Sequence, residues 1–266
     1  MDHQDLLDLK GQVAFVTGAG QGAGRGIAML LAAHGARVAV NDFAAERAQA
    51  VAQEIRSAGS HAIAVQADVG DLDSVRAAVA ATGAELGPPT ILVNNAGMAG
   101  PTAQMELAPP FWESDPAEWD RYFRTNSQGV MNCCHAVLAA MVAAQHGRLV
   151  TIVSDAARVG EARLSVYAAA KAAAAGFVRS LAKETGRHGI TCNAISLSTL
   201  EPPMAPGALA DFLGSDRTKA QLSRYVIRRF GKPDDVAAMV LFLCSDAASW
   251  ITGQTYPVNG GYSFAV

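Results

Sequence analysis

Short strand-like runs alternate with longer helix-like stretches along the whole chain, and this alternation restricts the fold more than any other feature. The runs are rich in valine, isoleucine and alanine and are apolar almost throughout, as in strands buried on both faces of a sheet. They cover residues 13–18, 36–42, 61–69, 90–97, 147–154, 190–197 and 253–261. Helix-like stretches fill the intervals, at about 24–35, 44–59, 71–86, 116–141, 167–186 and 233–246. The pattern predicts a parallel sheet with helices on both faces, which is the doubly wound α/β architecture.

The length of the chain fits one domain. It has 266 residues, half of them hydrophobic, which lies within the range that α/β folds reach as a single unit. We therefore expect a single domain over residues 1–266. Two long connections interrupt the regular alternation, at 97–115 and 198–229, and such loops often line a pocket. The second is predicted to be a substrate loop within the domain.

Charge and cysteine content argue against several classes of protein. The formal net charge of −3 offers no basic field for a nucleic-acid backbone. The cysteines form no C-x-x-C pair, so we expect no metal site and no disulfide framework, with Cys133, Cys134, Cys192 and Cys244 as reduced, buried thiols. The polar N-terminal segment does not resemble a signal peptide, and the apolar runs are strand-length or broken by charges. We expect a cytoplasmic protein without membrane or nucleic-acid partners.

The first predicted strand ends in a glycine-rich turn that opens a helix. Backbone N–H groups at such a helix start attract a phosphate. The common G-x-G-x-x-G spacing is absent, and the chain reads T-G-x-x-x-G-x-G instead. Gly18 is expected to make the tight turn, Gly22 to let a pyrophosphate approach, and Gly24 to let the helix pack on the strand, whereas Gly20 and Gly26 are expected to be incidental. A plain strand–helix turn could use the same glycines.

This glycine spacing resembles that of the short-chain dehydrogenase/reductase family. The resemblance spans nearly the whole chain, from "LKGQVAFVTGAG" to the ending "FGKPDDVAAMVLFLCSDAASWITGQTYPVNGG". It implies a Rossmann-type doubly wound sheet of seven parallel strands, a nicotinamide dinucleotide as cofactor, a small-molecule alcohol or ketone as substrate, and assembly as a homotetramer.

The residue that ends the second strand bears on the choice of cofactor. Asp42 can accept hydrogen bonds from a ribose 2′-hydroxyl, and its carboxylate would repel a 2′-phosphate. Relatives that bind the phosphate have a basic residue where this chain has Gln21 and Phe43. These positions predict NAD rather than NADP. The alternative is that Asp42 only caps the following helix.

Further cofactor residues follow from the resemblance. Asp68 and Val69 stand where the family contacts adenine, and "NNAG" (94–97) where it lines the cofactor beside the fourth strand. By spacing alone, both could be ordinary turns at strand ends. The complete predicted set is Gly18, Gln21, Gly22, Ala23, Gly24, Asp42, Phe43, Asp68, Val69, Asn95, Ala96, Gly97, Tyr167, Lys171 and Leu200.

Four residues match the catalytic group of the family. Tyr167 and Lys171 form Y-x-x-x-K on one helix face, Ser154 ends the fifth strand, and Asn126 lies in "RTNSQGV". Tyr167 is expected to act as general acid and base, with its pKa lowered by the Lys171 ammonium and a cationic nicotinamide. Lys171 would also hold the nicotinamide ribose. Ser154 would hydrogen-bond the substrate oxygen, and Asn126 would hold a water that links Lys171 to solvent.

The chain departs from the family after the sixth strand. Leu197 and Ser198 stand where the family has Pro-Gly, and Pro202 where it has a threonine that meets the nicotinamide carboxamide. Thr199, or backbone groups around Leu200, are the expected substitutes.

The substrate is less defined. "SDAARVG" (154–160) resembles members that oxidise alicyclic hydroxyacyl-CoA thioesters, and Arg158 or Arg163 either meet phosphates there or are surface arginines. Five apolar pocket candidates favour a hydrophobic secondary alcohol or ketone, although they could equally be core or oligomer contacts: Met98, Trp112, Leu200, Met204 and Phe212. One alternative function is a catalytically silent NAD-binding regulator or scaffold, which usually lacks the tyrosine or lysine. Another is an epimerase or dehydratase, which usually has a longer C-terminal part.

Overall fold

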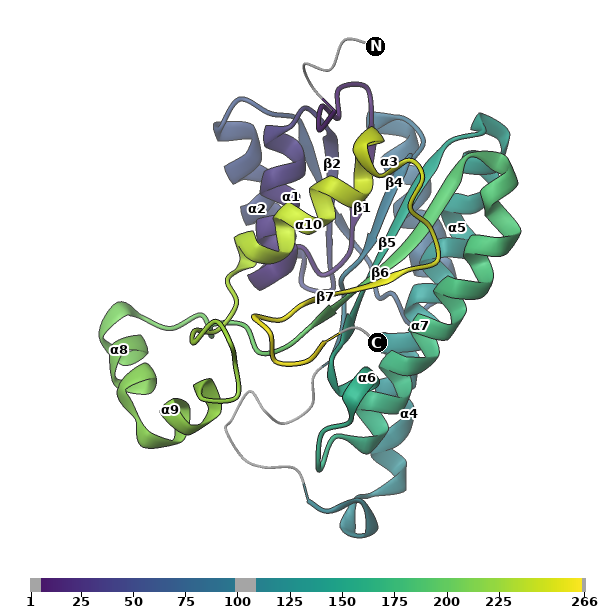
Figure 1. The fold of residues 1–266 in the computed structure, drawn as a ribbon. Coiled ribbons are helices and arrows are strands. Elements are labelled where there is room, and N and C mark those ends of the chain that lie inside the picture. The colour runs from purple at the N-terminus through teal and green to yellow at the C-terminus, as the bar shows by residue number, and fades with distance from the viewer. Residues whose placement is uncertain (1–5, 99–108, 265–266) are drawn as a thin grey trace.

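Seven parallel strands form one sheet in the computed structural model, which describes residues 6–98 and 109–264. The order across the sheet is β3-β2-β1-β4-β5-β6-β7 (Figure 1). The strands are β1 (Val13–Val16), β2 (Arg37–Asp42), β3 (Ala62–Gln66), β4 (Ile91–Asn94), β5 (Gly147–Ser154), β6 (Ile190–Leu197) and β7 (Thr255–Val258). The predicted doubly wound sheet is confirmed, and the strands end up to three residues earlier than the apolar runs suggested.

Helices cover both faces of this sheet. The helices α1 (Gly22–Ala33), α2 (Ala45–Ser57) and α10 (Pro233–Cys244) lie on one face, and α3 (Leu72–Leu86), α5 (Gly129–Ala144) and α7 (Ser165–Thr185) on the other (Figure 1). Shorter helical segments are η3 (Phe111–Glu113), η4 (Pro116–Glu118), α4 (Trp119–Phe123), η5 (Arg124–Gln128), α6 (Ala156–Val159), η6 (Gly186–His188), α8 (Pro206–Gly214), α9 (Asp216–Leu222) and η7 (Asp246–Ala248). All six long helices were expected from the sequence.

The core consists of two apolar layers, one on each face of the sheet. In β1, Ala14 and Val16 belong to the layer under α1 and α10, whereas Val13 and Phe15 belong to the layer under α3, α5 and α7. Successive side chains of a strand point to opposite faces, so a strand covered on both sides must be apolar at every position. This explains the unbroken apolar runs of the sequence.

Residues from about 116 to 141 were expected to form one helix, and the structure divides the stretch 116–144 into several. They comprise η4, α4, a π-helical turn at Arg124–Gln128 and α5. By length and composition alone, this is the one stretch among the described residues that could cross a membrane. Its apolar residues Val130, Val137 and Met141 are buried in the core against the sheet, so the stretch is accounted for as a core helix.

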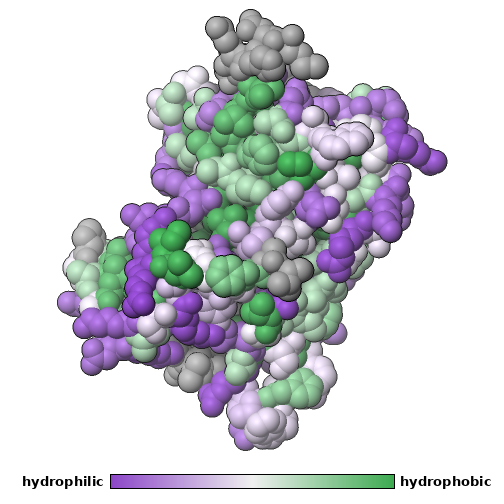
Figure 2. All heavy atoms as spheres, viewed as in Figure 1, coloured by the Kyte–Doolittle hydropathy of each residue, from purple (hydrophilic) through white to green (hydrophobic). Residues whose placement is uncertain are grey.

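Half-buried apolar side chains remain on the outer surface of α1 and α10. Figure 2 shows apolar residues gathered over this part of the molecule, with hydrophilic residues around them. Met29, Leu30, Met239 and Phe242 pack against the core from this side and are only partly covered.

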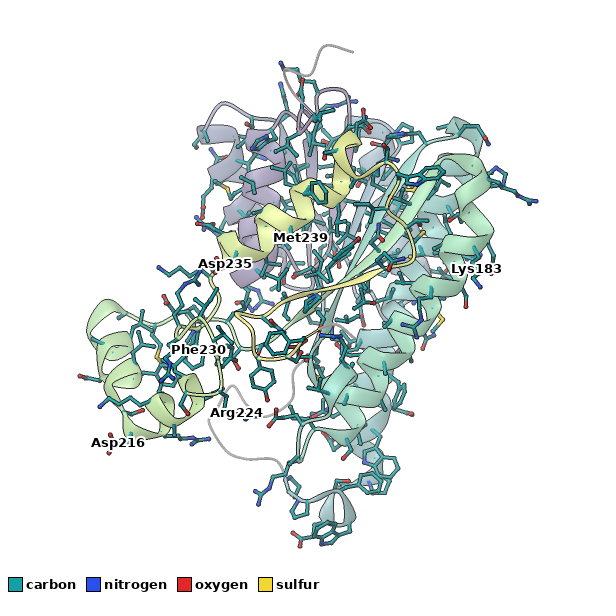
Figure 3. All side chains as sticks on the ribbon, in the orientation of Figure 1. Lys183, Asp216, Arg224, Phe230, Asp235 and Met239 are labelled. Atoms are coloured by element: carbon teal, nitrogen blue, oxygen red, sulfur yellow. The ribbon has the colours of Figure 1, made fainter. Side chains whose placement is uncertain are left out.

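The connection at 198–229 contains two helices that the sequence analysis did not expect. Helices α8 and α9 stand apart from the sheet, on the left in Figure 1. Phe230 lies between these two helices and the main body in Figure 3. Its ring stacks on Phe212 of α8 with ring centroids 5.9 Å apart and so connects the helices to the rest of the molecule. At the base, Leu200 pairs with Gly231 in an isolated parallel bridge. We call the segment 198–230 the lid.

Candidate active site

The predicted site residues lie at one edge of the sheet. From β1, the strands β2 and β3 are added toward one edge of the sheet, whereas β4 to β7 are added toward the other edge. The direction in which strands are added therefore changes between β1 and β4. Ligands of doubly wound sheets bind at such a switch point, beyond the carboxyl ends of the strands. Gly18, Asp42, Asp68 and Asn95 follow or end β1, β2, β3 and β4, and Ser154 ends β5. The topology therefore brings them together.

The glycine turn has the conformation that its spacing predicted. Gly18 and Gly22 have φ of +60° and +55°, which is the left-handed region that favours glycine. A Cβ on Gly24 would overlap the carbonyl oxygen of Gly18 and the side-chain nitrogen of Asn95, so the helix start packs directly on the turn. A Cβ on Gly22 would meet no atom within 4 Å. The turn is thus closed behind Gly24 and open beside Gly22.

Thr17 and Asn95 lock this turn to the end of β4. The Thr17 hydroxyl accepts hydrogen bonds from the backbone N–H of Asn95 (3.0 Å) and Ala96 (2.9 Å). The Asn95 side chain donates to the carbonyls of Thr17 (2.9 Å) and Gly18 (3.0 Å). Asn95 was predicted only as a cofactor contact; its bridging role was not predicted, although an amide directly after the strand was the available signal.

The expectation that Gly20 and Gly26 are incidental was wrong. A Cβ on Gly20 would lie 2.6 Å from the Cβ of Arg47 and 2.7 Å from Oδ2 of Asp42. A Cβ on Gly26 would lie 2.7 Å from the Cβ of Pro233, where α1 packs on α10. Both positions lack room for a side chain, because neighbouring elements approach closely there.

Replacing Gly24 with alanine is expected to lower the free energy of unfolding by about 2 kcal/mol, because the added methyl group has no space. NADH binding should weaken as well, since the turn must shift. Gly83→Ala in α3 is the matched control: its Cβ meets nothing within 4 Å, and it should be neutral or slightly stabilising. Urea unfolding and NADH fluorescence titration measure both effects. Equal stability of the two variants would contradict the packing argument.

Asp42 is buried, with 4% of its surface exposed, and its carboxylate is already bonded within the chain. Oδ2 accepts from the Gly20 N–H (3.0 Å), and Oδ1 accepts from the Ala44 N–H (3.0 Å) and from Arg47 (2.8 Å). The carboxylate thus holds the backbone just before α2, although the N-cap residue is Ala44 and no side-chain cap bond is formed there. Arg47, which was not predicted as a site residue, places a cation beside the predicted ribose position.

The residues predicted to contact adenine line the neighbouring strand ends. Oδ1 of Asp68 accepts from the Gly70 N–H (2.8 Å), and Oδ2 pairs with Arg124 (2.8 Å), so the carboxylate closes a turn. Val69 is buried, whereas Phe43 is 69% exposed beyond β2. Gln21 and Ala23 lie at the start of α1, where Gln21 is the N-cap residue. Adenine contacts by Asp68 and Val69 stay a prediction.

The four predicted catalytic residues form two pairs, Asn126 and Lys171 beside Gly97 and Ser154 with Tyr167 at the end of β5. A Cβ on Gly97 would lie 3.0 Å from both Oδ1 of Asn126 and Nζ of Lys171. Nζ of Lys171 also donates to the Ile152 carbonyl (2.9 Å), two residues before Ser154. Ser154 in turn is hydrogen-bonded to Tyr167. Helix α7 thus presents Tyr167 and Lys171, one turn apart, to the end of β5.

The electrostatics of this group differ from the sequence-based expectation. Burial raises the pKa of Tyr167, and the hydrogen bond from Ser154 only partly opposes this. Burial also lowers the pKa of Lys171 from 10.5 to about 8, because the ammonium is enclosed. The expected lowering of the Tyr167 pKa by Lys171 was therefore wrong for the protein by itself, since the same burial acts on both side chains.

Asn126 is fully buried in the π-helical turn, and its amide binds a backbone segment. Oδ1 accepts from the Met98 N–H (3.0 Å), and Nδ2 donates to the Met98 carbonyl (3.0 Å). The side chain therefore holds the loop that follows β4. Its predicted role in holding a water beside Lys171 stays a prediction.

The departure after β6 is compensated by a residue of the lid. The hydroxyls of Ser198 and Tyr225 lie 2.5 Å apart, and the Tyr225 hydroxyl accepts from the Thr199 N–H (3.2 Å). The Thr199 hydroxyl accepts from Gln221 (3.1 Å). Ser198 thus anchors the lid where the family has glycine, and contact of Thr199 or Leu200 with the carboxamide stays a prediction.

The apolar pocket candidates do not form one set. Trp112 is 82% exposed, so the described structure gives it no pocket wall. Phe212 packs inside the lid against Phe230, as the alternative core interpretation allowed. Met204 is partly exposed on the lid, Leu200 lies at its base, and Met98 is held by Asn126.

Comparison with known proteins supports the motif-based interpretation. A family model described as enoyl-(acyl carrier protein) reductase matches residues 18–263. The chain is 36% identical over 249 residues to 3-oxoacyl-(acyl-carrier-protein) reductase FabG of Staphylococcus aureus, covering 93% of this chain and 96% of that protein. It is 39% identical over 252 residues to cis-4-hydroxycyclohexanecarboxylate dehydrogenase of Sinomonas cyclohexanicum, covering 95% and 96%.

Solved structures agree with the fold. A gluconate 5-dehydrogenase from Burkholderia cenocepacia, in complex with NADP and tartrate, matches with a TM-score of 0.88 and 30% identity over 98% of this chain and 99% of that one. A putative short-chain alcohol dehydrogenase from Sinorhizobium meliloti matches with a TM-score of 0.87 and 36% identity over 97% and 98%. With a family model over residues 18–263, relatives more than 30% identical over nearly their whole length and a matching fold, this chain belongs to the short-chain dehydrogenase/reductase family.

Proposed function

We propose that this protein is an NAD(H)-dependent oxidoreductase that interconverts a secondary alcohol and a ketone, with Tyr167 as general acid and base. The observation that carries the proposal is the placement of Ser154, Tyr167 and Lys171 at the end of β5: Tyr167 is hydrogen-bonded to Ser154, and Lys171, one helical turn on, donates to the Ile152 carbonyl and lies beside Gly97. A half-buried phenol that is bonded to a hydroxyl, with a buried amine one helical turn away, is suited to proton transfer.

The residues divide the chemistry among themselves. The bound nicotinamide would supply or accept the hydride. Tyr167 exchanges the proton with the substrate oxygen, Ser154 hydrogen-bonds that oxygen as charge develops, and Lys171 binds ribose hydroxyls. The raised pKa of Tyr167 keeps the phenol protonated at neutral pH, which suits donation to a nascent alkoxide. Alcohol oxidation needs the phenolate, so it is expected to be faster at higher pH.

The strand ends fit a dinucleotide. The open side of Gly22 leaves room for a pyrophosphate at the start of α1, where backbone N–H groups and the helix dipole favour an anion. Asp42 ends β2, the strand next to β1, and its carboxylate bonds the Gly20 N–H of the glycine turn. A ribose that follows the pyrophosphate would therefore lie next to Asp42. The exposed ring of Phe43 offers an apolar surface beyond it.

The preference for NAD rests on Asp42. A 2′-phosphate beside a buried carboxylate meets a like charge, which costs several kcal/mol when both are desolvated. Arg47 lies on the same carboxylate and would be the natural partner of such a phosphate if Asp42 were absent. The gluconate 5-dehydrogenase structure contains NADP, so the preference must be measured.

Asp42→Ala is expected to raise the ratio of kcat/KM for NADP over NAD by about 100-fold, because the repulsion disappears and Arg47 is released. Arg47→Ala in the Asp42→Ala background should remove most of the gain, since the phosphate then lacks its cation. Initial rates with both cofactors test this. If wild type and Asp42→Ala use the two cofactors in the same ratio, the assignment of Asp42 falls.

For the substrate we propose a hydrophobic secondary alcohol or ketone, of the alicyclic, steroid-like or hydroxyacyl-CoA kind. Relatives named for a hydroxycyclohexanecarboxylate and for a 3-oxoacyl group support this class. Arg158 is turned inward and bonded to Asp155, so it is not free for a phosphate. Arg163 lies between Ser154 and Tyr167 with φ of +69° and is the arginine that remains exposed there.

A dehydrogenase screen tests the function. Secondary alicyclic alcohols, ring hydroxycarboxylates and hydroxyacyl-CoAs are offered with NAD or NADP, and the reverse ketones with NADH or NADPH, following the absorbance of the reduced cofactor. We expect turnover with NAD(H). The competing proposal, a silent NAD-binding regulator or scaffold, predicts NADH binding without turnover of any substrate; the retained Tyr167 and Lys171 favour the enzyme.

We further propose a single domain with residues 198–229 as the substrate loop, a cytoplasmic location and a homotetramer. The partly covered apolar surface of α1 and α10 supports the assembly, as do Ala172 and Ala173, which are exposed on α7. Size-exclusion chromatography with light scattering would show a monomer if the proposed assembly is wrong.

A further inference from the structure

Strand β5 extends past its neighbour just where Ser154 is placed. Its pairing with β4 ends at Thr151, whereas its pairing with β6 continues to Ser154, opposite Leu197. The last three residues therefore have a strand on one side only. Ser154 stands at the tip of this extension and needs another support to hold its hydroxyl against Tyr167.

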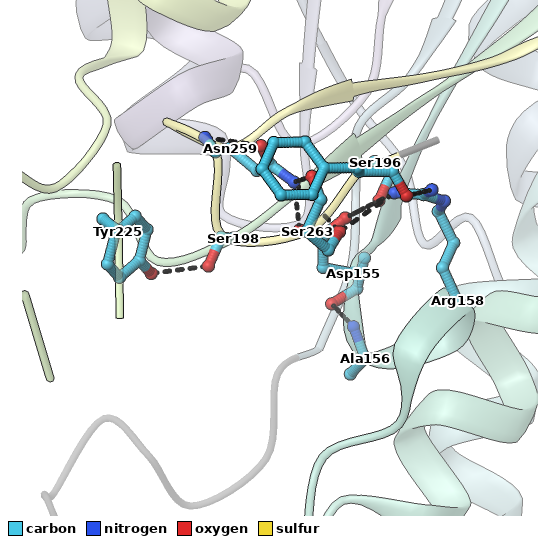
Figure 4. Close-up of polar contacts among 11 residues, drawn as sticks. Asp155, Ala156, Arg158, Ser196, Ser198, Tyr225, Asn259 and Ser263 are labelled. Carbon is cyan, nitrogen blue, oxygen red and sulfur yellow. Dashed lines mark hydrogen bonds and ion pairs between the residues drawn. The ribbon is translucent and has the colours of Figure 1, made fainter. Parts of the chain in front are cut away.

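The residue after Ser154 supplies that support. Asp155 is buried, with 2% of its surface exposed, and its N–H donates to the Leu197 carbonyl (2.8 Å). Its carboxylate accepts from four side chains of three separate segments (Figure 4): at Oδ1 from Ser196 and from Arg158 (3.2 Å), and at Oδ2 from Asn259 (2.6 Å) and Ser263 (3.1 Å). All its lone pairs are used, and Arg158 compensates its charge.

We propose that Asp155 is a positioning residue of the active site, which fixes Ser154 by tying the tip of β5 to β6 and to the segment 259–264. The inference rests on the proposed function, because it assigns Asp155 a task in that reaction. A buried carboxylate is costly unless every acceptor position is filled, so the cluster holds one arrangement and not several. The Ser154 hydroxyl accepts from the Ala156 N–H (3.2 Å), so its position depends on the backbone on both sides of Asp155.

The segment 259–264 thereby supports the active site from the C-terminal side. Arg158 also donates to the Ser263 hydroxyl (3.2 Å) and to the Phe264 carbonyl (2.9 Å). Tyr262 donates to Glu161, which lies between Ser154 and Tyr167 in the chain. The backbone of Gly260 accepts from Ile227 of the lid (2.9 Å). Segment 259–264 is thus bonded to Arg158 and Glu161, which lie between Ser154 and Tyr167, on one side and to the lid on the other.

Asp155→Asn is the direct test. The amide introduces an N–H group among four donors, so at least one contact breaks and the tip of β5 loosens. Because a small misplacement of a reacting group can cost about 100-fold, we expect kcat to fall by about 10- to 100-fold. The dissociation constant of NADH should stay within about threefold, since the glycine turn is untouched. Ser263→Ala removes one donor and leaves the charge paired, and should lower kcat by about threefold.

Asp246→Asn is the matched control. Asp246 pairs with Arg148 at the opposite end of the same strand, so this variant also breaks an ion pair of β5, but far from Ser154. It should lose stability and keep kcat. The reciprocal double variant Asp155→Asn/Asn259→Asp restores a carboxylate–amide pair and should recover part of the lost kcat. An Asp155→Asn kcat within about threefold of wild type, or a fall equal to that of Asp246→Asn, would overturn the proposal.

Hydrogen exchange separates this inference from the proposed function. In Asp155→Asn, backbone amides of residues 154–157 and 259–263 should exchange faster, and those of β1 and β2 should not change. If wild type turns over no substrate, the proposed function fails, and exchange alone decides whether Asp155 holds the tip of β5. Unchanged exchange at 154–157 removes the anchoring role whatever the activity.

Discussion

Replacing Tyr167 with phenylalanine is expected to lower kcat by about 10³-fold in either direction, because the hydroxyl that is hydrogen-bonded to Ser154 and proposed to exchange the proton is lost. The ring is kept, so the dissociation constant of NADH should change by less than about twofold. Steady-state rates and NADH fluorescence titration measure the two quantities separately.

Tyr256→Phe is the control for loss of a phenol in general. Tyr256 lies in β7 and packs on the apolar layer under α10, away from Ser154. It should leave turnover unchanged. Turnover by Tyr167→Phe at the wild-type rate, with the control equally active, would mean that the proton comes from another group.

The second large effect is expected at Lys171, with opposite signs for activity and stability. Lys171→Met should lower kcat by about 10²-fold, because the ammonium no longer binds the ribose or supports the phenolate. The same change should raise the free energy of unfolding by about 2 kcal/mol near neutral pH, since burial of the ammonium costs about 3 kcal/mol and its bond to the Ile152 carbonyl returns about 1 kcal/mol.

The pH dependence of this gain has a definite sign. The pKa of Lys171 is about 8 in the folded protein and near 10.5 in the unfolded chain. Below pH 8 both states carry the proton and the full cost of burial is present. Between the two values the unfolded chain binds more protons, so the stability of wild type rises with pH. The advantage of Lys171→Met should therefore shrink and vanish near pH 10.5.

Urea unfolding at neutral pH and near pH 10 checks this, with Lys183→Met as the control. Lys183 lies on the same helix and points to solvent (Figure 3), so its replacement should change neither stability nor turnover. A Lys171→Met protein less stable than wild type at neutral pH would show that the amine is held by favourable contacts that outweigh its burial. Such a trade of stability for a charged group in a closed site is common in enzymes.

Much of the architecture could be read from the chain because its causes are local. A strand buried on both faces must be apolar at every position, and a helix needs its own period and caps, so the seven strands and six long helices were all expected. Two motifs are likewise determined over a few residues. The glycine turn depends on the spacing of Thr17, Gly18 and Gly24, and the pair on one face of α7 depends on the spacing of Tyr167 and Lys171. The proposed roles of Tyr167 and Lys171 were predicted in this way.

What only the tertiary structure decided are contacts between segments far apart in sequence. Gly20 and Gly26 owe their lack of a side chain to β2 and α10, Asn95 bonds to a turn formed by the first strand, and Asp155 collects donors from β6 and the C-terminal segment. The direction of the Tyr167 pKa belongs to the same class, because burial is a property of the packed molecule. Sequence alone determined the periodic elements and their motifs, whose physics acts over a few residues; which polar groups meet, and how deeply they are buried, depended on how those elements came together.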